Sequence, residues 1–122
     1  MSNLRTVDYL VIGDVTHDKL PGGNYTVGGT ASYAALTAAA LGCQVGIVTS
    51  AGPEFDASFL PPNVQIVIRA APATTTFENQ YINNHRQQFM YQMALPLTAE
   101  VVPELWQHTP LVHIGPLTHA CS

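Results

Sequence analysis

An alanine-rich segment between glycines constrains the fold of this chain more than any other feature. Residues 30–41 (TASYAALTAAAL) follow Gly28-Gly29 and precede Gly42. Alanine has the highest helix propensity, and a glycine directly after a helix readily adopts the left-handed conformation that ends it. Thr30 and Ser32 are both candidates for the N-cap. The segment therefore predicts a helix from Thr30 to Leu41, slim enough to pack closely against a sheet.

Three apolar runs surround this helix in the sequence. They lie within Val7–Ile12, Gln44–Thr49 and Leu111–Ile114, and each is rich in β-branched or large aliphatic residues. Continuous rather than alternating hydrophobicity is typical of strands that are covered on both faces. We therefore predict an α/β fold in which these strands are neighbours in one mostly parallel sheet with flanking helices.

The middle of the chain has a different pattern. Val64–Arg69 reads as a strand, and two arms at Thr74–Ile82 and Gln87–Met93 read as a β-hairpin around Asn83–Arg86, because asparagine tolerates the positive φ of a turn. A short helix is predicted at Ala99–Gln107, where Pro103 opposes it. Alternation along the two arms predicts one aromatic face on the hairpin, made by these side chains: Phe77, Tyr81, Phe89, Tyr91 and Met93.

The composition excludes several classes of function. Hydrophobic residues make up 47% of the chain, charged residues only 10%, and the net charge is −4, so no basic surface for nucleic acid is expected. No run is long enough to span a bilayer, and the start does not read as a signal peptide. Cys43 and Cys121 are too far apart for a metal or redox motif, which favours reduced thiols in a cytoplasmic protein. The five histidines, His113 and His119 included, form no metal-ligand pattern.

Two features are candidates for contact with a ligand. The first is the segment 13–18 (GDVTHD), which follows the first predicted strand at the edge where open α/β sheets bind ligands. A carboxylate at this edge can accept hydrogen bonds from two hydroxyl groups of a polyol. The alternative is that Asp14 and Asp18 only form a turn.

The second feature is the Gly28-Gly29 pair at the start of the helix. Glycines allow a ligand to approach the backbone, and the free N–H groups of a helix start bind oxygen atoms. The alternative is a tight turn with no ligand. The sequence contains no Gly-x-Gly-x-x-Gly fingerprint after the first strand and no Gly-Lys-Ser/Thr, so neither a dinucleotide site nor a Walker loop is indicated.

In combination these motifs resemble the N-terminal part of PfkB/ribokinase-family carbohydrate kinases. In that family an opening strand ends in Gly-x-x-x-x-Asp, a short β-segment follows, and Gly-Gly opens an alanine-rich helix that ends in Gly. Here the three parts are residues 13–18, the segment 24–27 (NYTV) and the segment 28–42 (GGTASYAALTAAALG). The resemblance covers nearly the whole chain and implies a partial ribokinase-like fold with a β-hairpin lid, whose segments would lie near 19–27 and 64–93.

The resemblance also implies a substrate site for a sugar or polyol. Asp18 would hold substrate hydroxyls, Gly28 and Gly29 would offer backbone contacts, and Thr30 and Tyr33 would line the same pocket. Tyr33 stands where the family usually has asparagine, so an inositol- or nucleoside-like substrate is as well supported as ribose. The aromatic face of the lid would cover this pocket or pair with a second copy in a homodimer.

The catalytic part of the family is not found in this sequence. Its Gly-Ala-Gly-Asp motif, whose aspartate is the base, has no counterpart, because Gly115 is the only glycine after Gly52. The resemblance thus implies an N-terminal fragment, residues 1–122, without the C-terminal nucleotide-binding half. No catalytic residue, cofactor or metal ligand is expected in the chain, whereas ATP and Mg²⁺ are expected for the full-length parent. The competing hypothesis is a non-catalytic binding or interaction module of the same fold.

Overall fold

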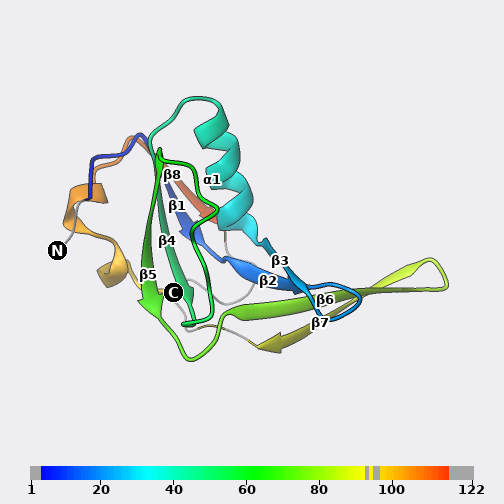
Figure 1. Cartoon of the computed structure of the whole chain (residues 1–122). Helices are drawn as coiled ribbons and strands as arrows, with labels where there is room; N and C mark the ends of the chain where they lie inside the picture. The colour runs from blue at the N-terminus through cyan, green and yellow to red at the C-terminus, as the bar shows by residue number, and fades with distance from the viewer. Residues whose placement is uncertain (1–3, 93, 95–96, 116–122) are drawn as a thin grey trace.

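We analysed a computed structural model of the chain, which describes residues 4–92, 94 and 97–115. The described part contains two four-stranded sheets, one α-helix and two short 3-10 helices (Figure 1). In chain order the elements are β1 (Tyr9–Gly13), β2 (Thr16–Lys19), β3 (Tyr25–Gly28), α1 (Thr30–Ala40), β4 (Val45–Ala51), β5 (Val64–Ala70), β6 (Thr75–Ile82), β7 (His85–Gln92), η1 (Ala99–Val101), η2 (Glu104–Trp106) and β8 (Leu111–Gly115).

The first sheet is parallel, with the strand order β5-β4-β1-β8. Leu10 of β1 pairs with Gly46 of β4 on one side and with Val112 of β8 on the other. This arrangement confirms the predicted parallel sheet, and α1 forms the crossover between β1 and β4. The fold class is therefore α/β, as the continuous apolar runs indicate.

The two faces of the parallel sheet are covered differently. Alanines of α1 pack on one face against the β1 and β4 side chains Val11, Val45 and Ile47. Trp106 covers the other face, where it packs against Leu10 of β1 and Val48 of β4. The ring of Trp106 reaches the sheet because Gly46 has no side chain there, and its indole N–H donates to the Arg5 carbonyl at 2.8 Å. One face thus has a helix and the other has 3-10 turns around a buried tryptophan.

The ends of α1 agree only in part with the prediction. Gly42 adopts the left-handed conformation (φ +94°) directly after the helix, as predicted. The N-cap, however, is Gly29 and makes no side-chain cap hydrogen bond, so the expectation of a Thr30 or Ser32 cap is wrong. The Asp14 carbonyl accepts the Ala31 N–H at 3.0 Å, and this bond replaces a side-chain cap.

The second, smaller sheet has the strand order β3-β2-β6-β7 and contains the hairpin β6–β7, which extends away from the parallel sheet (Figure 1). Its turn is Asn83-Asn84, both with positive φ, so it has two residues rather than four. A loop with an even number of residues pairs odd positions of one arm with even positions of the other. Phe77 accordingly pairs with Met90, and Phe89 pairs with Glu78. The predicted single aromatic face is therefore wrong, because Phe77 and Phe89 lie on opposite faces.

Other predictions for the middle of the chain are refined by the structure. Strand β5 lies at the edge of the parallel sheet, so of the segment 64–93 only the part from Thr75 joins the small sheet. The helix predicted at Ala99–Gln107 is replaced by η1 and η2, with Pro103 between them. His119 and Cys121 lie outside the described residues. No helix in the described part of the chain has the length and apolarity that a membrane crossing requires.

Candidate functional site

The chain passes from the parallel sheet to the small sheet directly after β1. Asp14 and Val15 form this connection, and both are buried. The Val15 N–H donates to the Thr49 hydroxyl at 3.3 Å, which ties the connection to the carboxyl end of β4. Because parallel strands present their carboxyl ends at one edge, the segment after Gly13 lies at the ligand-binding edge of the sheet.

Gly29 brings the start of α1 against this connection. Its φ is +94°, and a Cβ at this position would collide with the Asp14 carbonyl oxygen. Both facts require glycine, since L-residues with side chains rarely adopt this conformation and no space is available for one. Gly29 therefore has a structural reason to be glycine besides any contact with a ligand.

Asp18 lies in strand β2 and not in a turn, which removes the turn-forming alternative for this residue. Its Oδ1 atom accepts the Thr16 hydroxyl at 2.8 Å, and Thr16 is fully buried. Thr16 pairs with Gly28 in the neighbouring strand β3, and a Cβ on Gly28 would collide with Oδ2 of Asp18. The half-buried carboxylate thus lies directly over Gly28, held by a neighbouring hydroxyl group.

Thr30 is placed beside a different strand end. A Cβ on Gly115, the last residue of β8, would collide with the Thr30 methyl group. Gly115 pairs with Gly13 of β1, so Thr30 lies where the carboxyl ends of β1 and β8 meet the first turn of α1. The structure therefore brings Asp18 to Gly28 and Thr30 to Gly115, with Gly29 between the two groups in the chain.

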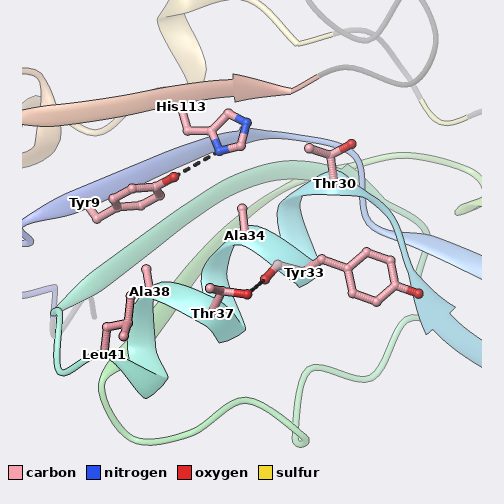
Figure 2. A pocket seen from close by; sticks show the side chains of 8 residues that line it. All are labelled: Tyr9, Thr30, Tyr33, Ala34, Thr37, Ala38, Leu41 and His113. Atoms are coloured by element: carbon pink, nitrogen blue, oxygen red, sulfur yellow. Dashed lines mark hydrogen bonds between the residues drawn. The ribbon is translucent and has the colours of Figure 1, made fainter.

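Tyr33 has a separate position on the exposed face of α1, with 60% of its surface accessible. Together with Thr30 it borders a groove of about 570 Å³ between α1 and β8. In this groove the Tyr9 hydroxyl and His113 Nδ1 are 3.0 Å apart. In Figure 2 the Tyr33 ring points away from the Tyr9–His113 pair. Neither this groove nor a second one that Tyr33 borders is lined by Asp18, Gly28 or Gly29.

An aromatic cluster connects the small sheet to the loop after β4. The His17 ring stacks on Phe55 with centroids 5.8 Å apart and contacts Tyr25 at 5.5 Å. Glu54 lies nearby and accepts the Thr74 N–H at 2.6 Å. Partial burial raises the pKa of Glu54, but the hydrogen bonds from Thr74 and the charge of His17 outweigh it and hold the pKa below its ordinary value. Glu54 is therefore ionised at neutral pH.

Sequence reasoning did not identify Thr16, although a signal exists. Residues two apart in a strand share a face, so Thr16 could have been paired with Asp18 if that segment had been read as a strand.

Among the described residues, no group of three or more His, Cys, Asp or Glu side chains could hold a metal ion.

The fold defines the class of protein: the chain has the ribokinase-like fold and matches part of solved ribokinase-family kinases. It is similar to a pyrophosphate-dependent kinase of the ribokinase family, solved as a sulfate complex, with 27% identity, a TM-score of 0.74, and coverage of 93% of this chain and 43% of that one. A pyrophosphate-dependent kinase in the ribokinase family complexed with a pyrophosphate analog and myo-inositol gives 28% identity and a TM-score of 0.72, with coverage of 93% of this chain and 42% of that one.

A more distant structure agrees on the fold alone. Fructokinase from Xylella fastidiosa has 16% identity and a TM-score of 0.56, with coverage of 80% of this chain and 37% of that one. This chain therefore spans less than half the length of the solved kinases it matches. No protein-family model matches the sequence, and no curated protein is significantly similar to it.

Proposed function

We propose that this chain is the N-terminal, substrate-binding part of a kinase that phosphorylates a cyclic polyol of the inositol class. The observation that carries the proposal is the Asp18 carboxylate, which lies over Gly28 in the small sheet, shortly after the chain leaves the carboxyl end of β1. The similarity to a pyrophosphate-dependent kinase complexed with myo-inositol supports the choice of substrate class.

The chemistry of the edge fits a ligand with neighbouring hydroxyl groups. An ionised carboxylate accepts hydrogen bonds through both oxygens. The Thr16 hydroxyl group occupies only one acceptor position of the Asp18 carboxylate, on Oδ1. In the proposal, Asp18 accepts two hydroxyl hydrogen bonds of the polyol, and the backbone at Gly28 and Gly29 approaches the ring closely. Thr30 adds a hydroxyl group from the start of α1. Tyr33 is proposed to contact the outer side of the substrate.

The remaining steps belong to the parent enzyme. We propose Mg²⁺ together with ATP as the phosphoryl donor, and pyrophosphate is the second donor to test because the similar solved kinases depend on it. The described residues contain no cluster that would hold the metal, so no step of the transfer is assigned to them. A cytoplasmic location and a homodimer through the small sheet complete the proposal.

Equilibrium titration with myo-inositol tests the role of Asp18. We expect Asp18→Asn to weaken binding by about tenfold or more, because a hydrogen bond to a charged acceptor contributes about 1.5–3 kcal/mol. Asp8→Asn is the matched control, since Asp8 holds the Gln44 N–H at the opposite edge of the sheet. Equal affinities for all three proteins would contradict the proposed site.

Thr16 gives a test of how the carboxylate is oriented. Thr16→Val removes the hydroxyl group that donates to Asp18, whereas Thr16→Ser retains it. We expect weaker myo-inositol binding for the valine variant and near-normal binding for the serine variant, with both folds intact by circular dichroism. If the two variants bind equally well, Thr16 does not position Asp18.

An experiment on the full-length parent protein distinguishes the kinase from the alternative function, a binding module without catalysis. Both hypotheses expect polyol binding at Asp18. Only the kinase hypothesis expects a full-length parent that converts the bound polyol to its phosphate with ATP or pyrophosphate.

A further inference from the structure

A second groove lies on the other side of the small sheet from Asp18. His17 precedes Asp18 in β2, so its ring points to the opposite face, where it contacts Tyr25. Tyr25 borders a groove of about 470 Å³ between β3, the first turns of α1 and the loop 52–63. This groove shares neither Asp18 nor Gly28 with the proposed polyol site.

The aromatic walls of this groove are held in place by ring contacts. Tyr25 contacts His17 at 5.5 Å, His17 stacks on Phe55 at 5.8 Å, and Phe55 meets Phe59 edge-on at 6.3 Å. Tyr25 and Phe59 are the two ends of this chain of rings, and both line the groove. Tyr33 adds a third ring from α1. All three rings are at least 41% exposed, so they present apolar surface that nothing in the described chain covers.

Ser32, a residue that lines the same groove, has an unsatisfied hydroxyl group. Ser32 is only 2% exposed, and its Oγ atom has no hydrogen-bond partner among the described residues. A buried polar atom without a hydrogen-bond partner destabilises the folded state. Because the Asp14 carbonyl accepts the Ala31 N–H at the start of α1, the Ser32 hydroxyl group does not cap the helix. A ligand with an N–H or O–H group would remove the cost.

The electrostatics of the groove favour a cation. Asp56 lines it and accepts the Ser58 N–H at 2.9 Å, and this bond lowers the pKa of the Asp56 carboxyl group. No lysine, arginine or histidine is among the described residues that line the groove. Anions are therefore disfavoured, and a positive charge would meet aromatic rings and an ionised carboxylate together.

We propose that this groove is a binding site for a small primary alkylammonium compound. The ammonium group donates hydrogen bonds to Ser32 Oγ and to the Asp56 carboxylate, and the alkyl chain packs on Tyr25, Tyr33 and Phe59. Any ring face that the ammonium group reaches would attract it further, because aromatic faces carry negative potential. The groove shares Tyr33 with the proposed polyol site, but ammonium binding in the groove does not require that a polyol binds at Asp18.

Three probes of equal length and different charge test the site at neutral pH: n-butylamine, n-butanol and butyrate. Each is titrated into the ¹⁵N-labelled 122-residue chain, and amide chemical shifts are followed. We expect saturable shifts with butylamine at residues 25–27, 32–36 and 56–59, weaker binding of butanol and none of butyrate. Butanol binding as tightly as butylamine would overturn the proposal, as would butylamine shifts located elsewhere.

Two variants and a matched control complete the test. Ser32→Ala should weaken butylamine binding about tenfold, and Asp56→Asn, at an exposed position, about two- to fivefold. Ser50→Ala is the control, because Ser50 is also buried and unpaired but does not line the groove. Wild-type affinity in both the Ser32 and Asp56 variants would overturn the proposal, as would an equal loss in the Ser50 variant.

Discussion

At the scale of single residues, Gly29 connects the fold to the proposed substrate site. Gly29 and Gly42 have the same φ of +94°, but only Gly29 also has the Asp14 carbonyl in the place of a side chain. Gly42→Ala should cost about 1 to 2 kcal/mol of unfolding free energy, the cost of a left-handed residue with a Cβ. Gly29→Ala should cost more, because the backbone must also move. Urea unfolding measures both, and equal losses would show that the close contact is unimportant.

Glu54 gives a pH dependence with a definite sign. Its pKa is lowered in the folded state, so it binds fewer protons there than in the unfolded chain. Its contribution to stability is therefore complete above the unfolded pKa and is lost as the pH falls through the lower folded pKa. Glu54→Gln should flatten the loss of unfolding free energy on acidification below about pH 4.5. An unchanged acid profile in urea titrations would contradict this role.

Single residues differ in how well the sequence predicts them. Asp18, Gly28 and Gly29 stand in a recognisable order, so they could be selected as candidates without coordinates. The Thr16–Asp18 hydrogen bond was harder to predict, because the spacing of two residues is a signal only if the segment is a strand, and β2 forms by pairing with β3 and β6. The free hydroxyl group of Ser32 was also unpredictable, because a carbonyl from a distant segment caps the helix instead.

At the scale of secondary-structure elements, the hairpin β6–β7 offers a direct test of register. Phe77 is 8% exposed, whereas Phe89 on the opposite face is 40% exposed. Phe77→Ser should therefore destabilise the chain by about 3 kcal/mol, in the range of large-to-small core changes, and Phe89→Ser by much less. Thermal unfolding followed by circular dichroism measures the two changes. A larger loss for Phe89→Ser would indicate a different register.

The predictability of the elements follows from how local their causes are. The strands β1, β4 and β8 and the helix α1 are marked by continuous apolar runs, alanines and glycines, so they were predicted correctly. The four-residue loop expected from the sequence and the observed two-residue loop both put Phe77 and Phe89 on opposite faces. The single aromatic face was predicted wrongly because alternation was followed along each arm separately, without pairing the arms across the turn. The two 3-10 turns arise because Pro103 interrupts the segment and Trp106 is buried on the sheet.

At the scale of the whole molecule, we predict that the 122-residue chain transfers no phosphate by itself. Phosphoryl transfer depends on groups that position the donor and stabilise its charge. The sequence has only four lysine and arginine residues, and Arg5 binds the Pro62 carbonyl at the amino-terminal edge of the sheet. A phosphate-transfer assay with Mg²⁺, a polyol panel and either ATP or pyrophosphate measures this. Polyol-dependent turnover that disappears in Asp18→Asn would contradict the prediction.

The central claim is that a cyclic polyol binds where the carboxyl end of β1 meets Asp18 and the start of α1. Amide chemical-shift mapping of the labelled chain with myo-inositol tests it most directly, because it locates the ligand as well as detecting it. We predict saturable shifts at residues 13–18 and 28–30 that are lost in Asp18→Asn. Shifts confined to the aromatic groove of Tyr25 and Phe59, or no shifts at any accessible concentration, would contradict the claim.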